Sequence, residues 1–135
     1  MMSGRCLCGA VTFSAEHVET EHHVCLCGMC RRWSGGAGFL GASCEGVTFP
    51  STEHLGRFAS SDWAERGFCK LCGTTLFYFL KPTQRYTMSV GTFDDASPFR
   101  LVREIFIDHK PNGYAFAGDH ERWTESETFA RLSPP

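Results

Sequence analysis

The sequence predicts a mainly β fold with little helix, stabilised by metal-binding cysteines. Three observations lead to this expectation. Short segments rich in β-branched and aromatic residues are bounded by Gly, Pro or Ser, which is typical of strands joined by turns. No long stretch shows the apolar periodicity of an amphipathic helix. Eight cysteines fall mostly into close groups, and in a reducing compartment such grouping indicates metal binding.

Five segments are expected to form strands of packed antiparallel sheets. They are residues 10–15, 46–50, 75–80, 85–93 and 103–109. Helix is expected at two places: a short turn after Cys27, in GMCRRWSG, and the tail TESETFARL. In the tail, Thr124 and Glu127 have the spacing of a capping box. The final Ser-Pro-Pro, residues 133–135, is expected to end this helix, because proline cannot continue it.

Composition indicates a single domain over residues 1–135 and narrows the possible partners. The chain has 135 residues, 42% of them apolar and 21% charged, which is enough for one hydrophobic core. The formal charge is −2 and the basic residues are scattered, so no nucleic-acid partner is expected. Apolar runs are too short to cross a membrane, and the N-terminus lacks the apolar region of a signal peptide. We therefore expect a cytoplasmic protein.

Four of the cysteines can form a closed metal site. Structural zinc sites prefer about four tetrahedral ligands, commonly thiolates. The motif CLC supplies Cys6 and Cys8, and CKLCG supplies Cys69 and Cys72 from a tight turn in which Gly73 can adopt a positive φ. We expect these four cysteines to hold zinc and to tie the N-terminus to the middle of the chain. Metal binding would then contribute directly to folding.

Three further cysteines lie within CLCGMC, at Cys25, Cys27 and Cys30. A metal with three protein ligands keeps one position open for water or substrate, which is the arrangement of catalytic sites. Three thiolates favour a soft fourth ligand such as an incoming thiol. We therefore expect a second, catalytic zinc here, suited to thiolate transfer or to addition of a thiolate to a small electrophile.

Two alternatives for CLCGMC stay open. His22 or His23 could complete a closed site with three cysteines and one histidine, which would make this zinc structural. Alternatively, the first two cysteines of CLCGMC could pair with the C-x-x-C motif. That pairing is disfavoured, because it leaves Cys30 and the N-terminal cysteine pair without a metal. Cys44 has no partner at metal spacing and is expected to be a small buried residue.

Several polar residues beside these motifs are candidates for the substrate pocket. Arg31 and Arg32 directly follow the last cysteine of CLCGMC, where a guanidinium could pair with a substrate carboxylate. Ser60, Ser61 and Arg66 precede the C-x-x-C motif and are further candidates for lining the cleft.

Three motifs together resemble a known family. GRCLCGAV (residues 4–11), CLCGMCRR (25–32) and RGFCKLCGTTLF (66–77) are similar, in this order, to the glutathione-dependent formaldehyde-activating enzyme family, which includes centromere protein V. VGTFDD (90–95) and PFRLVREIFID (98–108) also resemble its C-terminal half. Two positions depart from the family pattern, because Leu26 and Glu104 stand where histidine is common.

The resemblance implies a β-tent of packed antiparallel sheets and two zinc ions per chain, one structural and one catalytic. By position, the structural ligands are Cys6, Cys8, Cys69 and Cys72, and the catalytic ligands are Cys25, Cys27 and Cys30. It further implies a carbon–sulfur lyase that acts on an adduct of glutathione or another small thiol. The family's activity combines formaldehyde and glutathione into S-hydroxymethylglutathione. The alternative is a non-catalytic binding module with two structural zinc sites.

Overall fold

A computed structural model describes residues 1–132, in which ten strands form one mixed sheet beside two short α-helices. The strands are β1 Met2–Arg5, β2 Thr12–Val18, β3 Glu21–Cys25, β4 Phe39–Thr48, β5 Leu55–Ala59, β6 Ala64–Cys69, β7 Thr75–Leu80, β8 Arg85–Ser89, β9 Arg100–Ile105 and β10 Glu121–Trp123. The helices are α1 Gly28–Ser34 and α2 Glu125–Arg131, and two 3₁₀ turns cover Val90–Thr92 and Ile107–His109.

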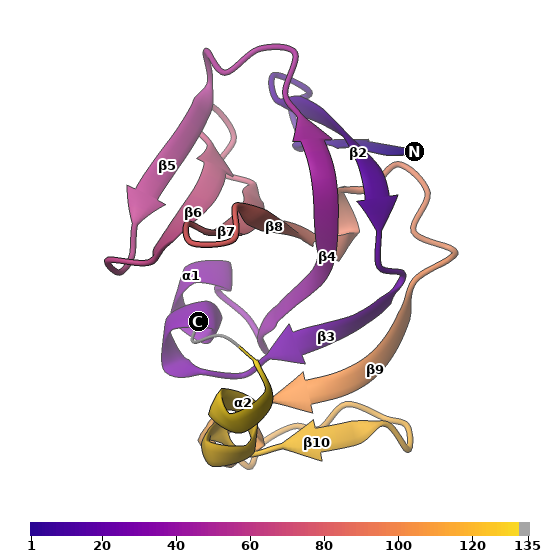
Figure 1. Ribbon diagram of the computed structural model, residues 1–135, viewed down its shortest axis with the longest axis vertical. Coiled ribbons are helices and arrows are strands. Elements are labelled where there is room, and N and C mark those ends of the chain that lie inside the picture. Colours follow the sequence, from indigo (N-terminus) through magenta and orange to yellow (C-terminus); the bar gives the residue numbers. More distant parts are fainter. Residues whose placement is uncertain (133–135) are drawn as a thin grey trace.

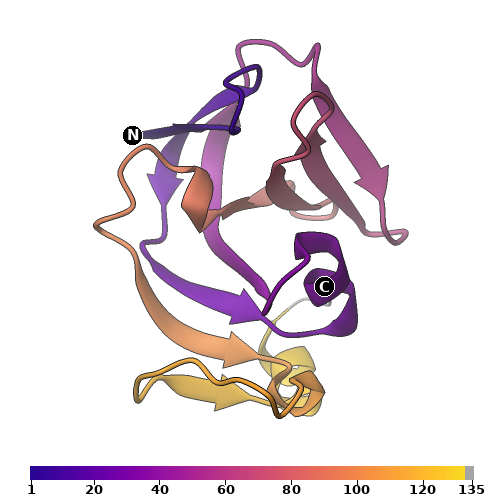
Figure 2. The same cartoon turned by 180° about the vertical axis from the view of Figure 1, so that it is seen from behind.

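The sheet divides at β4 into two arms (Figure 1). One arm continues from β4 through β8, β7 and β6 to β5, and the other through β3 and β9 to β10. β2 also pairs with β4 and carries β1. Both views place α1 in the angle between the two arms (Figures 1 and 2). This arrangement confirms the prediction of a mainly β, tent-like fold with little helix.

The predicted strands match the structure unevenly. The segment 75–80 coincides with β7, and the other four overlap β2, β4, β8 and β9. Most pairings are antiparallel as expected, but β9 runs parallel to both β3 and β10. Parallel neighbours require a long connection between them. The chain between β3 and β9 supplies one, because it passes through the whole other arm of the sheet before it returns.

The strand predicted over residues 103–109 is wrong beyond Ile105. Phe106 adopts a left-handed conformation with φ 59°, which strands do not accommodate. The chain then turns through Ile107–His109. Phe106 is only 2% exposed in this turn, so burial of the aromatic residue accompanies the interruption of the strand.

Both predicted helices are present. Thr124 caps α2, accepting from the backbone N–H of Glu127, whose side chain accepts from the Thr124 N–H in turn. This confirms the capping box. The predicted helix stop at residues 133–135 lies outside the described residues. α1 follows Cys27 and ends at Gly35, which has φ 71°. At seven residues each, neither described helix has the length of a membrane-spanning segment.

Buried side chains form two clusters. The larger lies where β2, β4, β7 and β8 meet, and its largest apolar members are Phe13, Leu76, Phe77, Met88 and Phe93. The smaller one packs around CLCGMC, with Tyr78 of β7 partly buried against it from the other arm, and its members are Cys25, Cys27, Cys30, Phe39, Ile105, Phe106 and Trp123. The second cluster therefore places three thiols in an apolar environment between the arms.

Gly67 is a point where the sheet has no room for a side chain. A Cβ atom there would lie 2.2 Å from two ring carbons of Phe77, which is fully buried against Phe49 and Tyr86. We expect Gly67→Ala to lower the free energy of unfolding by about 1–3 kcal/mol, as overpacked cores do. Urea unfolding measures this loss.

The matched control for Gly67→Ala is Gly36→Ala. A Cβ atom at Gly36 would meet nothing within 4 Å, and its φ is not positive. The expected change in unfolding free energy is within about 0.5 kcal/mol. Equal losses in the two variants would contradict the packing argument.

Candidate metal centres

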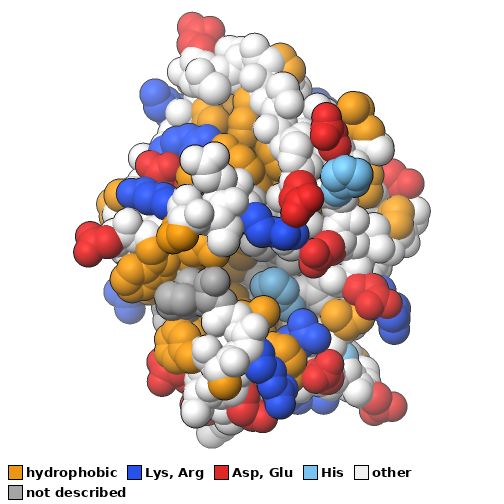
Figure 3. Space-filling view, in the orientation of Figure 1, with side chains coloured by type: hydrophobic (Ala, Val, Ile, Leu, Met, Phe, Trp, Pro, Cys, Tyr) orange, Lys and Arg blue, Asp and Glu red, His pale blue; other side chains and the backbone are white. Residues whose placement is uncertain are grey.

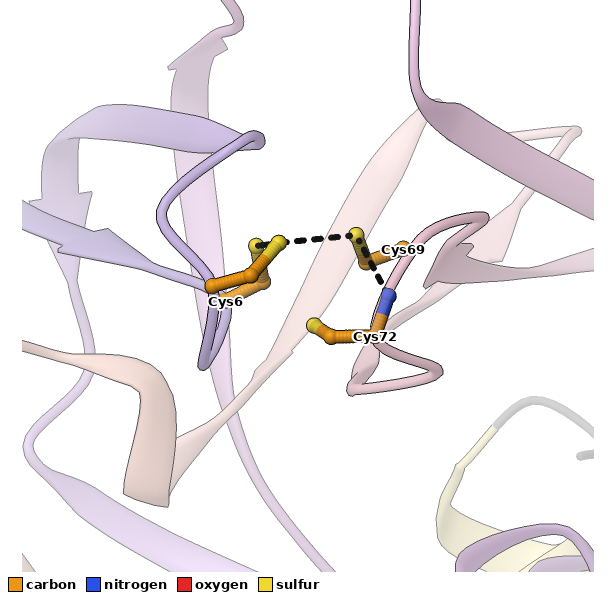
Figure 4. Close-up of side chains that lie close together, drawn as sticks. Cys6, Cys69 and Cys72 are labelled. Carbon is orange, nitrogen blue, oxygen red and sulfur yellow. Dashed lines mark hydrogen bonds between the residues drawn. The ribbon is translucent and has the colours of Figure 1, made fainter.

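The first candidate centre is a four-thiol cluster. The sulfur atoms of Cys6, Cys8, Cys69 and Cys72 all lie within 4.8 Å of one another. The Cys6 and Cys8 sulfurs are 3.6 Å apart, and those of Cys8 and Cys69 are 3.8 Å apart. A tetrahedral site with Zn–S distances of ~2.3 Å has S–S separations of about 3.8 Å. The four sulfurs therefore fit a zinc ion, and Figure 4 shows Cys6, Cys69 and Cys72 converging from two separate loops.

Two similar turns direct these sulfurs toward one another. In the C-x-x-C turn, the Gly73 N–H donates to the Cys69 carbonyl at 2.9 Å, and Gly73 has the predicted positive φ, at 79°. In the N-terminal turn, the Gly9 N–H donates to the Cys6 carbonyl at 3.1 Å, and its φ is 80°. Both turns therefore depend on a glycine, since other residues rarely adopt this conformation.

Thr74 joins the two turns. Its hydroxyl accepts a hydrogen bond from the Leu7 N–H at 3.0 Å and lies 3.2 Å from the Cys72 sulfur. The hydrogen bond from this hydroxyl lowers the pKa of Cys72 to about 5. The thiolate is the metal-binding form of cysteine, so this contact favours metal binding near neutral pH.

The second candidate centre is a three-thiol cluster formed by Cys25, Cys27 and Cys30. Cys25 ends β3, Cys27 caps α1, and Cys30 lies in the first turn of that helix. Their sulfurs also lie within 4.8 Å of one another, and each residue is at most 5% exposed. Within residues 1–132, no other Cys, His, Asp or Glu joins this cluster at the same spacing.

Without a bound metal, Cys27 is the member of this cluster whose thiolate form is most favoured. Hydrogen bonds from the Cys25 and Cys30 thiols lower the pKa of Cys27, and the Cys25 pKa is raised because its proton is held in that bond. The Cys30 backbone N–H also donates to the Cys27 sulfur at 3.4 Å. A bound metal would displace the remaining thiol protons, since metal binding and deprotonation are coupled.

The two histidines before the cluster have different surroundings. His23 lines a cavity with Cys25 and Cys30, and burial, followed by the nearby charge of Arg103, lowers its pKa to about 4. The His22 ring packs edge-on against Phe99, with centroids 6.0 Å apart. Neither imidazole belongs to the three-thiol cluster at 4.8 Å. The spacing therefore does not favour the closed site with three cysteines and one histidine.

The cavity beside the three thiols has a volume of about 200 Å³. Cys25 and Cys30 line it together with polar groups such as His23 and Thr87, and the apolar part of its wall comes from Phe39, Tyr78, Leu80, Ile105, Phe106 and Leu132. Figure 3 shows this face hollowed near its centre, with hydrophobic side chains gathered beside the hollow. The thiols thus have a small, largely apolar space next to them.

The arginines near the cluster are placed differently from one another. The Nε of Arg31 donates to the Leu26 carbonyl at 3.0 Å, and Arg32 is exposed. The cavity is not lined by any of the five polar candidates from the sequence, Arg31, Arg32, Ser60, Ser61 and Arg66. Arg66 is only 2% exposed and donates through Nη1 to the Cys30 sulfur at 3.4 Å. Arg66 is thus the arginine that touches a thiol of the cluster.

Three other positions singled out in the sequence lie outside both cysteine clusters. Leu26 is fully buried and its N–H donates to the Ile105 carbonyl at 3.0 Å. Glu104, 1% exposed, pairs with the Arg122 Nε at 2.9 Å. Cys44 is fully buried in the larger core cluster, as expected, and burial raises its pKa to about 11.

Comparison with known proteins agrees with this picture. A model of the family described as glutathione-dependent formaldehyde-activating enzyme matches residues 1–109. An uncharacterized lyase of Schizosaccharomyces pombe is 33% identical over 131 residues, which span 96% of this chain and 95% of that protein. A crystal structure of a Rhodobacter sphaeroides protein shares the fold, with a TM-score of 0.60 at 20% identity over 91% of this chain and 100% of that one. The chain therefore belongs to the glutathione-dependent formaldehyde-activating enzyme family.

Proposed function

We propose that this protein is a zinc-dependent carbon–sulfur lyase that acts on the adduct of a small thiol, such as glutathione, with a small aldehyde. One observation carries the proposal: three sulfurs within 4.8 Å of one another lie beside a cavity, and no fourth Cys, His, Asp or Glu among the described residues joins them at that spacing. The family match and the lyase name of the yeast relative support this class of reaction.

The two clusters would have different tasks. The four-thiol cluster would hold a structural zinc, and Cys25, Cys27 and Cys30 would hold the catalytic one. A zinc ion held by these three thiolates would supply a Lewis acid that favours a soft sulfur ligand and lowers the pKa of a thiol bound to it. The wall of the cavity is largely apolar, and a low local dielectric constant strengthens charge interactions.

The proposed reaction balances without a further co-reactant. In the direction of adduct formation, the thiol adds across the carbonyl of formaldehyde. A carbon–sulfur bond forms, the carbon–oxygen double bond becomes single, and the thiol proton ends on the new hydroxyl. The reverse reaction breaks the carbon–sulfur bond and returns that proton to sulfur. We place the reaction in the cytoplasm, where thiols are kept reduced.

Native mass spectrometry of the purified chain tests this proposal. We expect two zinc ions per chain, and the mass of one further thiol when glutathione is added. S-methylglutathione has the same peptide but no free thiol, so we expect it not to bind and the mass of the zinc-loaded chain to stay unchanged. Formation of S-hydroxymethylglutathione from formaldehyde can then be followed by NMR. If the chain holds two zinc ions but its mass does not change with glutathione or with 2-mercaptoethanol, the proposal is contradicted. That result would favour a binding module with two structural sites.

A further inference from the structure

Arg66 is a buried cation with incomplete pairing. It lies on β6, is 2% exposed, and is the largest of the fully buried side chains. Its Nε donates to the Ser60 hydroxyl at 3.0 Å and its Nη1 to the Cys30 sulfur at 3.4 Å. Its Nη2 is buried without a partner among the described residues, and no described carboxylate forms an ion pair with this guanidinium. A buried charge is costly unless it is paired, so the thiol cluster is the natural counter-charge.

Two aromatic rings hold the guanidinium in place. The Arg66 Cζ lies 4.9 Å from the ring centroid of Trp33, on α1, and 5.2 Å from that of Tyr78, on β7. Cations are attracted to aromatic faces, and the planar guanidinium of arginine stacks on them. Trp33 packs in turn on Phe39, with centroids 4.9 Å apart. Groups from α1, β4 and β7 therefore fix the orientation of Arg66 toward Cys30.

The charge of the three-thiol centre explains what such a cation can do. Zn²⁺ with three thiolates carries one net negative charge, and a thiolate in the fourth position would add a second. In an apolar environment, like charges repel strongly. A fixed positive charge hydrogen-bonded to a ligand sulfur offsets this repulsion. This compensation matters most when the fourth ligand is itself anionic.

We propose that Arg66 is a positioning residue that allows the three-thiol centre to accept a fourth, anionic sulfur ligand. This inference rests on the proposed function, because it requires a metal at that centre. Nη1 donates to the Cys30 sulfur, so the guanidinium charge lies beside a ligand sulfur and offsets the repulsion between that sulfur and an incoming thiolate. Arg66 therefore acts on the affinity for the thiolate more than on the affinity for the metal.

Cobalt-substituted protein gives a readout that does not depend on activity. Co²⁺ replaces Zn²⁺ in thiolate sites, and its absorption spectrum changes when a thiolate joins the metal. Titration with 2-mercaptoethanol, which has no carboxylate, measures the affinity for a thiolate alone. We expect Arg66→Met to keep two metals per chain and to weaken thiol binding at least about tenfold, the order of a hydrogen bond to a charged group. Arg66→Lys keeps the charge but cannot donate to Ser60 and Cys30 at once with the planar geometry of a guanidinium. Its expected loss of thiol affinity is therefore intermediate between wild type and Arg66→Met.

Arg57 provides the matched control. It is also an arginine stacked on an aromatic ring, with its Cζ 4.9 Å from the Phe77 centroid, and it pairs with Glu65 instead of a thiol. Arg57→Met is expected to leave thiol affinity within about twofold of the wild type. If Arg66→Met does not fold, the comparison of Arg66→Lys with wild type takes its place, and unchanged thiol affinity in that variant overturns the proposal.

The remaining outcomes separate this inference from the proposed function. Wild-type affinity in Arg66→Met overturns the role of Arg66 while leaving the enzyme proposal intact. A loss seen with glutathione but not with 2-mercaptoethanol would assign Arg66 to a substrate carboxylate and would also overturn the role proposed here. If the wild-type cobalt protein shows no spectral response to any thiol, the proposed function itself fails.

Discussion

Replacing Cys69 with serine is expected to lower the free energy of unfolding by more than about 4–5 kcal/mol, the size of loss associated with a destroyed metal site. Cys69 is fully buried, and its sulfur lies 3.8 Å from that of Cys8, which belongs to the N-terminal turn. A structural zinc in a small domain contributes its binding free energy to folding. Domains of this size have about 5–15 kcal/mol of total stability, so the variant should lose much of it.

Thermal unfolding of the zinc-loaded proteins, with and without a chelator, measures this effect. The wild type is expected to lose stability when the chelator is added, whereas Cys69→Ser has already lost its four-thiol site. Cys44→Ser is the matched control, because Cys44 is also a fully buried thiol but lies outside both clusters. Its expected cost is about 0.5–3 kcal/mol. If Cys69→Ser is no less stable than Cys44→Ser, the four-thiol cluster does not support the fold as proposed.

The local parts of the fold were predictable because short-range chemistry determines them. The capping box at Thr124 needs only Glu127 three residues away, and the turn at Gly73 needs only a residue that tolerates positive φ. β5 and β6 were missed for the opposite reason. Their sequences, LGRFA and AERGFC, carry glycine and charge. They become strands because β6 pairs with β7 and β5 pairs with β6, and this tertiary pairing outweighs weak local propensity.

The candidate metal centres were easier to anticipate than the cavity beside them. Cysteines separated by one or two residues converge through local geometry, and the grouping predicted from spacing is the one that the sulfur distances give. The cavity wall combines Phe39 and Tyr78 from one part of the sheet with Ile105 from a parallel strand. No local pattern encodes that long-range parallel pairing.

Arg66 shows the same limit for a single residue. The sequence marks it only as one of three polar residues before the C-x-x-C motif, whereas Arg31 and Arg32 adjoin a cysteine directly. Contact between Arg66 and Cys30, 36 residues away, depends on how β6 packs against α1. Proximity along the chain is therefore a poor guide to which cation accompanies a buried thiolate.

Replacing Cys27 with serine is expected to have the opposite outcome to Cys69→Ser: a folded protein with one zinc fewer. Cys27 caps α1, and its sulfur accepts the Cys30 N–H at 3.4 Å. Serine is a preferred N-cap residue, so its hydroxyl can take over that hydrogen bond. It cannot take over the metal, since a neutral hydroxyl is a poor replacement for a thiolate ligand. The proposed lyase activity is expected to fall on the order of 10³-fold, as when a key electrostatic group is removed from an active site.

Cys27→Ala separates the two tasks of this residue. Alanine loses both the metal ligand and the helix cap, so it should match Cys27→Ser in zinc content and activity but be less stable by about 0.5–2 kcal/mol. Metal analysis and thermal unfolding of both variants measure this difference. Because the four-thiol cluster is unchanged in both, each should keep one zinc and remain folded. If Cys27→Ser instead unfolds as completely as Cys69→Ser, both clusters are structural, and the division between a supporting and a reactive zinc site is wrong.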